Sequence, residues 1–259
     1  EGATEILSHP AIFLVHVKHL YSAAMLSVAR NDLDAAGKLL EQLGAVPRKY
    51  GQAKRSEIAI RERLWTIRLT MARKSLDFEA GRTITKEVRT AFSMDGSRIV
   101  GAMETSLAYA CAELLMYAGQ PSEALYWINW LRNRATSNAR ADLSYFSWVL
   151  FLLAHFDLGN TEVIRHELRA TEKFFRTHSR FPDFEAILLD FLKNYLNTID
   201  PHAKRTCIEK FQHALEKGLS SPQNPLLRHY FELLSWTKAH QEGMPIRDIL
   251  AQKAKSDRT

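Results

Sequence analysis

Glycine, proline and cysteine are all scarce in this sequence of 259 residues, and each shortage excludes a class of structure. The 11 glycines and 8 prolines are too few for the many turns of a β-rich fold of this length. The two cysteines, Cys111 and Cys207, form no C-x-x-C pair and no metal-binding spacing. We therefore expect no disulfide framework, no metal site and a reducing compartment.

Long apolar runs are also missing. The longest, from Ser147 to Phe156, is about half the length of a membrane span. The first ten residues carry two acids and no basic segment of the kind that opens a secretory signal. These absences predict a cytoplasmic protein that is not inserted in a membrane. Because the sequence starts with Glu1 instead of methionine, we expect it to be part of a longer chain.

What the sequence does have is a recurring unit of about 40 residues. Each unit consists of an apolar-periodic stretch, a short polar turn and a second amphipathic stretch. The turns align at Asn31, Leu76, Gly119, Gly159, Ile199 and Gly243, which gives spacings of 45, 43, 40, 40 and 44. Such a period is typical of stacked helix pairs.

The turns have the chemistry of one helix ending and the next beginning. Gly119 and Gly159 can adopt the left-handed conformation that closes a helix. Asn160 and Asp200 are expected to cap the helix that follows each of them. The remaining prolines are expected either in a first helical turn (Pro121, Pro201, Pro245) or as breaks between repeats (Pro47, Pro182, Pro222).

The apolar pattern predicts an all-α fold of inner and outer helices. Over residues 144–158 apolar side chains cover most of the helix circumference, as in a helix buried on two sides. Over residues 163–175 they form a narrower stripe, as in a helix exposed on one side. An inner helix that alternates with an outer one is the arrangement of a helical solenoid.

Small and aromatic residues recur at matching places in these units. They are Ala24 and Ala112 in first helices, Ala36 and Ala124 in second helices, and Trp65, Trp148, Leu188 and Tyr195 in first helices. In this the chain resembles tetratricopeptide-repeat (TPR) proteins, and residues 156–176 also resemble uncharacterised bacterial TPR-like proteins. It departs from the TPR pattern where Gly81 and Ile164 replace alanine and where Leu69 and Leu152 replace a small residue. The resemblance implies a right-handed α-solenoid of about five to six helix-turn-helix repeats, forming one domain over residues 1–259.

No pattern of known catalytic chemistry accompanies the repeats. The sequence has no Gly-rich phosphate loop, no G-x-S-x-G and no H-E-x-x-H. His16 and His19 could share a helix face, but a metal ion needs further ligands, so a pair of ordinary surface or core histidines is favoured. Glu162 and Glu167 lie among arginines and are expected to form surface ion pairs. We therefore expect neither an enzyme nor a cofactor.

Positive charge is concentrated in the second unit. Residues 48–89 hold 12 Lys and Arg against 5 Asp and Glu, a net charge of +7, whereas the whole chain carries +6. Two interpretations stay open. The charges are either a solvated face or a patch that attracts an acidic partner.

The TPR resemblance implies which residues line a concave groove, because first helices do so in that family. By register these are Lys18, Tyr21, Arg63, Thr66, Thr70, Arg73, Lys74, Tyr109, Glu113, Tyr117, Lys193 and Asn197. Arginine grips carboxylates with two parallel hydrogen bonds, and tyrosine adds amphipathic contact area. The paired asparagines with which some TPR proteins clamp a C-terminal carboxylate are absent from the second unit.

The favoured function is a scaffold for protein–protein interaction that binds an acidic peptide or a partner helix in this basic groove. A sensory or oligomerisation domain of a regulator, whose effector region lies upstream, is an alternative. Weak nucleic-acid binding is another alternative, suggested by the net charge of +6, although most of the chain is charge-balanced and it has no RNA- or DNA-binding motif. The apolar residues between Ile12 and Leu20 also suggest that a homodimer could form through the N-terminal helix.

Overall fold

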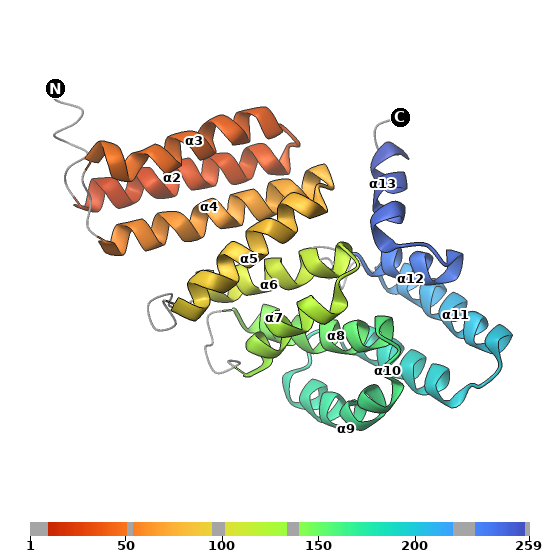
Figure 1. Ribbon diagram of the computed structural model, residues 1–259. Coiled ribbons are helices and arrows are strands. Elements are labelled where there is room, and N and C mark those ends of the chain that lie inside the picture. Colours follow the sequence, from red (N-terminus) through yellow and green to blue (C-terminus); the bar gives the residue numbers. More distant parts are fainter. Residues whose placement is uncertain (1–9, 51–53, 95–101, 134–139, 220–230, 257–259) are drawn as a thin grey trace. The chain divides into compact units, whose positions relative to one another are not determined.

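The computed structural model describes residues 10–50, 54–94, 102–133, 140–219 and 231–256. In these ranges it consists of 12 α-helices and has no strand, which confirms the all-α prediction (Figure 1). The helices are α2 (Pro10–Ala29), α3 (Leu33–Tyr50), α4 (Lys54–Ser75), α5 (Phe78–Met94), α6 (Ala102–Tyr117), α7 (Pro121–Asn133), α8 (Ala141–Asp157), α9 (Thr161–His178), α10 (Pro182–Asn197), α11 (Pro201–Leu219), α12 (Leu233–Glu242) and α13 (Ile246–Ser256).

Contacts run mainly between consecutive helices, and the chain divides into two compact units. Unit 1 comprises residues 1–114 and unit 2 residues 115–259, so that the boundary falls inside α6. We call α2, α4, α6, α8, α10 and α12 the first helices, and the helix that follows each of them a second helix. The units are described one at a time below.

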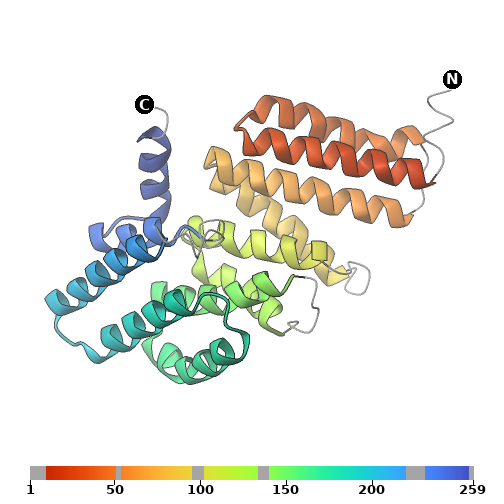
Figure 2. The same cartoon turned by 180° about the vertical axis from the view of Figure 1, so that it is seen from behind.

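Unit 1 is built around a mainly aliphatic core. Helices α2, α3 and α4 contact one another in pairs and lie side by side (Figures 1 and 2). Phe13 and Val17 of α2, Leu43 of α3 and Ile67 of α4 are almost fully buried between them. Removing this apolar surface from water is the main force that holds the three helices together.

Unit 2 is a run of helices from α7 to α13, each packed on the next. Its core is rich in aromatic side chains that touch across helices. Phe191 of α10 stacks on Phe211 of α11 with ring centroids 4.2 Å apart, and Trp236 of α12 meets Phe156 of α8 edge-on at 5.2 Å. Trp236 also donates a 2.8 Å hydrogen bond from its indole Nε1 to the carboxylate of Asp157.

The predicted turns share one backbone conformation. Five of the six aligned residues have a positive φ: Asn31 (62°), Leu76 (61°), Gly119 (70°), Gly159 (69°) and Gly243 (64°). A backbone N–H then reaches back five residues, from Asp32 to Ser27, Asp77 to Ala72, Gln120 to Leu115, Asn160 to His155 and Met244 to Ala239, at 2.9 or 3.0 Å. This left-handed closure satisfies carbonyls that the helix end leaves open. The sixth turn differs, because α10 ends on an extended Thr198.

Aspartates begin several of the second helices. Asp200 accepts the N–H of Ala203 at 2.7 Å, which confirms the predicted cap. Asp32 and Asp77 accept an N–H three residues on in the same way, at 3.0 Å each. The predicted cap by Asn160 is wrong, because its side chain makes no capping bond and its Nδ2 instead lies 3.1 Å from Nδ1 of His155.

Prolines mark most of the expected boundaries. Pro121 and Pro201 begin α7 and α11, and Pro182 begins α10, as predicted. Pro245 lies immediately before α13 instead of inside its first turn. The break expected at Pro47 is wrong, since α3 continues to Tyr50. Pro222 lies outside the described residues.

The positions that suggested a repeat are packing positions. Ala24, Ala36, Ala112 and Ala124 have no exposed surface, so each lets neighbouring helices approach closely. Gly81 stands in place of alanine in this pattern, and a Cβ added there would lie 2.7 Å from Cδ2 and 3.0 Å from Cγ of Leu114, so the leucine side chain would have to move.

One helix of the described chain has the length and apolar composition of a membrane span, over Ile12–Ala29 in α2. The prediction that no such segment exists rested on residues 147–156 and overlooked this helix, because His16, Lys18 and His19 interrupt its apolar run. The property concerns length and composition only.

Candidate functional site: the first-helix face of unit 1

The residues predicted for the groove fall into both units. Eight predicted partner-binding residues lie in unit 1, on α2, α4 and α6, and we call them the first-helix face: Lys18, Tyr21, Arg63, Thr66, Thr70, Arg73, Lys74 and Tyr109. Glu113, the acid predicted beside them, also belongs to unit 1. Tyr117, Lys193 and Asn197 belong to unit 2.

Arg63 links α4 to α2. Its guanidinium carbon lies 5.8 Å from the ring centroid of Tyr21, within the range of a cation–π contact. Its Nη1 also donates a 2.7 Å hydrogen bond to the backbone carbonyl of Ala59, one turn earlier in α4. These two contacts hold the long side chain in place, so a partner would meet an ordered cation.

Two threonines form the middle of the face. The hydroxyl of Thr66 donates to the Glu62 carbonyl at 2.9 Å, and that of Thr70 donates to the Thr66 carbonyl at 2.7 Å. Thr66 is buried and its oxygen lies 3.8 Å from the sulfur of Met103 on α6. Thr66 therefore joins α4 to α6, and the exposed part of this region belongs to Thr70.

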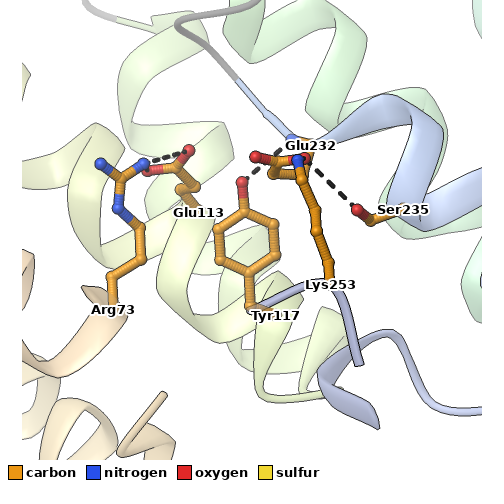
Figure 3. Close-up of polar contacts among 6 residues, drawn as sticks. All are labelled: Arg73, Glu113, Tyr117, Glu232, Ser235 and Lys253. Atoms are coloured by element: carbon orange, nitrogen blue, oxygen red, sulfur yellow. Dashed lines mark hydrogen bonds and ion pairs between the residues drawn. The ribbon is translucent and has the colours of Figure 1, made fainter. Parts of the chain in front are cut away.

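Arg73 and Glu113 join α4 to α6 a second time. Arg73 Nη1 lies 3.2 Å from both carboxylate oxygens of Glu113 (Figure 3). Glu113 is buried, whereas the Arg73 side chain keeps 36% of its surface exposed. The guanidinium is therefore fixed by an internal acid and still has a side turned to water.

A buried acid makes the face less basic than the sequence count suggests. Burial raises the pKa of Glu62, a change opposed by the neighbouring positive charge of Arg63 and reinforced by the negative charge of Glu104. We did not predict Glu62 or Glu104 as part of the site. The alternation Arg61-Glu62-Arg63 was visible in the sequence, but only the helix register shows that Glu62 turns inward.

Three cations of the face lack a salt bridge, although the charge of Arg63 acts on the neighbouring buried Glu62. In the described part of the chain Lys18, Arg63 and Lys74 form no salt bridge, and Lys18 and Lys74 are exposed. Lys18 lies on α2, and Arg63 and Lys74 lie at the two ends of the predicted set on α4. Their positive charge is the part of the predicted basic surface on which an acidic ligand could act.

Burial sets the two tyrosines of α6 apart from the rest. Tyr109 is 6% exposed and Tyr117 is 1% exposed, which leaves little of either ring for a partner. Within unit 2, the hydroxyl of Tyr117 accepts the backbone N–H of Glu232 at 3.0 Å, and its ring stacks on Phe231 at 4.9 Å. Figure 3 shows Glu232 in turn holding Ser235 and Lys253. Tyr117 thus acts as a structural anchor of unit 2.

The two predicted residues of α10 pair with the preceding helix. Lys193 lies 3.5 Å from the carboxylate of Glu172, and the amide oxygen of Asn197 accepts a 3.3 Å bond from Arg165. All four side chains are substantially exposed. Such surface pairs contribute about 0–1 kcal/mol each and leave both residues accessible.

Unit 2 also holds a polar cluster that the sequence did not indicate. Asp157 Oδ1 lies 2.8 Å from Nε2 of His240 and the same distance from Nε1 of Trp236, beside a cavity of about 210 Å³. The contributing residues are about 80 positions apart in the chain, so no local pattern announces the cluster. A cavity of this size is smaller than the roughly 300–1,000 Å³ of most ligand sites.

No group of three or more His, Cys, Asp or Glu side chains suited to a metal ion occurs among the described residues. His16 is half-buried and His19 is exposed on α2. Cys111 and Cys207 are both free, and burial raises the pKa of the Cys111 thiol well above its ordinary value. Comparison of the chain with protein-family models, with curated proteins and with solved structures gave no match.

Proposed function

We propose that the chain is a TPR-like α-solenoid that acts as a scaffold for protein–protein interaction, and that the first-helix face of unit 1 binds an acidic segment of a partner protein. The observation that carries this proposal is the meeting of predicted groove residues across first helices. Arg63 touches Tyr21 of α2, and Arg73 reaches Glu113 of α6. Contacts of this kind support a common register for α2, α4 and α6.

The repeat itself supports the architectural part of the proposal. The same left-handed closure ends five of the six first helices, at Asn31 and Leu76 in unit 1 and at Gly119, Gly159 and Gly243 in unit 2. In solenoid proteins, helix pairs that repeat in this way expose a row of first helices that binds extended partners.

The recognition chemistry rests on four cations, of which Arg63 and Arg73 are held by neighbouring residues. Lys18, Arg63 and Lys74 offer positive charge, while Arg73 offers the exposed side of a guanidinium that Glu113 keeps in position. Preorganised arginines lose less conformational entropy on binding than free ones. A peptide rich in Asp or Glu fits this pattern better than an apolar helix, because the exposed residues of the face are mainly polar.

Charge reversal tests the proposal. The triple variant Lys18→Glu, Arg63→Glu and Lys74→Glu reverses the three cations that lack a salt bridge and leaves the Arg73–Glu113 ion pair intact. We expect a labelled oligoglutamate peptide, followed by fluorescence anisotropy at low salt, to bind the parent chain and to bind the variant at least about tenfold more weakly. Partner capture from native cells should fall in parallel.

Lys86→Glu is the control for a single charge reversal, a change of two charge units instead of six, at an exposed position of α5, a second helix of unit 1. We expect it to leave binding within about twofold of the parent. If Lys86→Glu weakened binding as much as the triple variant does per substituted residue, net charge alone would attract the peptide. Tighter binding of an oligonucleotide of equal charge would favour the nucleic-acid alternative.

A further inference from the structure

The outer face of α2 carries an apolar stripe that the core of unit 1 does not use. The inward side of the helix consists of residues such as Phe13, Val17 and Leu20, all buried against α3 and α4. On the opposite side Ile12, Val15 and Leu26 are 40%, 66% and 51% exposed. Exposed aliphatic residues that gather along one helix face mark an interaction surface more often than scattered ones do.

The spacing of the stripe is that of helix-to-helix packing. Residues 12, 15, 19, 22 and 26 are separated alternately by three and four positions, which is the period of a two-helix seam. All five are exposed: Ile12, Val15, His19, Ser22 and Leu26. A partner helix laid along this stripe would contact all of them in turn.

The stripe is also symmetric about its centre. Seven residues before His19 lies Ile12, and seven residues after it lies Leu26, both large and aliphatic. Closer in, Val15 lies four positions before His19, and the small residues Ser22 and Ala23 lie three and four positions after it. An antiparallel second copy would therefore place Ile12 against Leu26 and Val15 against the small pair, twice over. Closed two-fold symmetry requires this kind of self-complementary surface.

A membrane is a poorer occupant for the same helix. Lys18, His19 and Ser22 lie at the middle of the apolar window, where a bilayer would be most apolar. The inward side of α2 is packed against α3 and α4, whose surfaces carry charged residues such as Lys38 and Arg68. Insertion of α2 would have to break the core of unit 1.

We propose that the chain forms a two-fold symmetric dimer through the outer face of α2, with the two helices antiparallel and His19 at the axis. In this arrangement Lys18 of each copy flanks the axis, and the described side chains of α2 include no carboxylate to neutralise it. Salt should therefore strengthen the dimer by screening the two lysines. Binding of an acidic partner to the first-helix face would weaken with salt, so the two proposals can fail separately.

The first test is the mass in solution, measured by analytical ultracentrifugation of the unmodified chain. We expect a concentration-dependent dimer whose dissociation constant rises at least about 100-fold in the double variant Val15→Lys and Leu26→Lys. Ile199→Lys is the matched control, because Ile199 is 93% exposed in unit 2 and lies outside the stripe. We expect the variants to keep the helical circular-dichroism spectrum of the parent, since all three residues are at least half exposed within one chain.

Cross-linking tests the register. In a Cys207→Ser background, His19→Cys should form an intermolecular disulfide on mild oxidation, because the axis brings the two copies of residue 19 together. Ile12→Cys alone should not, since its copies would be ~21 Å apart along the helices at a rise of about 1.5 Å per residue. An equal mixture of Ile12→Cys and Leu26→Cys chains should form the mixed disulfide.

Three results would overturn the proposal. One is a chain that stays monomeric at the highest soluble concentration. Another is a dimer that the double lysine variant does not weaken or that the three cysteine experiments do not trap in this register. The third is a monomer that sediments with phosphatidylserine-containing vesicles through α2, which would identify a lipid surface as the occupant.

Discussion

The two units both pack consecutive helices, but their cores are built from different side chains. Unit 1 buries mainly aliphatic residues between helices that are strongly charged outside, as in α4. Unit 2 buries a network of rings, in which Trp236 alone touches Phe156, Phe191 and His240. Large rings therefore give unit 2 many specific contacts across its helices.

The turns differ in the same way. Unit 2 closes its helices on glycine, at Gly119, Gly159 and Gly243, whereas unit 1 uses Asn31 and Leu76 in the same left-handed conformation. Glycine adopts that conformation without strain, asparagine tolerates it, and leucine is rarely found there. The comparison teaches that packing of the helix pairs imposes the turn, and that the local sequence only makes it easier or harder.

Loss of a ring from unit 2 should have the largest effect. Trp236→Ala removes a fully buried indole with its hydrogen bond to Asp157, and we expect a loss of about 3–5 kcal/mol in the free energy of unfolding. Ile67→Ala, the counterpart in the unit 1 core, should lose less, about 2–4 kcal/mol. Urea unfolding followed by circular dichroism measures both. An equal or larger loss for Ile67→Ala would remove the distinction between the cores.

Removal of a buried carboxylate should give the next largest difference in stability between the units. In unit 2 Glu185 accepts hydrogen bonds from the Tyr145 hydroxyl and from the backbone N–H groups of Arg180 and Phe181, at 3.0 or 3.1 Å. Glu185→Ala leaves these donors buried and unsatisfied, so we expect a loss of about 2–3 kcal/mol. Glu113→Ala in unit 1 should lose only about 1 kcal/mol, because the half-exposed Arg73 can be hydrated instead. The same urea experiment decides whether this order holds.

The turn residues should give smaller effects of opposite sign. Gly159→Ala places a Cβ in a left-handed turn and should lower the stability of unit 2 by about 1 kcal/mol, although nothing crowds the site. Leu76→Gly relieves that strain in unit 1 and should raise stability by up to about 1 kcal/mol, offset in part by the flexibility of glycine in the unfolded chain. Thermal unfolding of the two variants beside the parent gives both signs. A loss at Leu76→Gly would show that the leucine side chain contributes more by packing than its backbone loses.

The smallest effect should be the pH-dependent one, and Glu62 of unit 1 provides it. Burial raises the pKa of Glu62, so the folded protein binds a proton there more readily than the unfolded chain does. Below the unfolded pKa both states are protonated, and above the folded pKa the buried charge lowers stability. Glu62→Gln should therefore be neutral near pH 3 and stabilising by about 0.5–1 kcal/mol at pH 7.

Glu87, also in unit 1, is the control for that pH series, because its pKa is shifted in the opposite direction. Hydrogen bonds from Arg68 hold its pKa below the ordinary value, so its contribution is present at neutral pH and is lost as the pH falls. Glu87→Gln should lower stability at pH 7 and have no effect in acid. Parallel pH profiles for the Glu62 and Glu87 variants would contradict the assignment of one acid as buried and the other as paired.

The helix pairs could be predicted from the sequence because their signals are local. Of the six turn positions that the pattern aligns, Asn31, Leu76, Gly119, Gly159 and Gly243 have the same backbone conformation, whereas the turn at Ile199 differs. Two local predictions were wrong, because a pattern does not show which of several possible contacts a residue makes. Asn160 bonds to His155 instead of capping, and α3 continues past residue 47.

The candidate site could be predicted only in outline. Register placed Arg63 and Arg73 on α4, but the partners that fix them, Tyr21 and Glu113, are 42 and 40 residues away. Burial of Thr66, Tyr109 and Glu62 depends on how neighbouring helices pack, which composition does not encode. The cluster of Asp157, Trp236 and His240 is a tertiary feature for the same reason.

Hydrogen exchange tests the central claim most directly, that the first helices of unit 1 form a recognition face. Amide exchange of the chain is compared with and without saturating oligoglutamate peptide at low salt. If the peptide binds as proposed, peptic fragments from α2 and α4 take up deuterium more slowly in its presence, and fragments from α5 and α9 are unchanged. Slowing confined to the second helices, or no slowing at a peptide concentration that saturates the anisotropy signal, would contradict it.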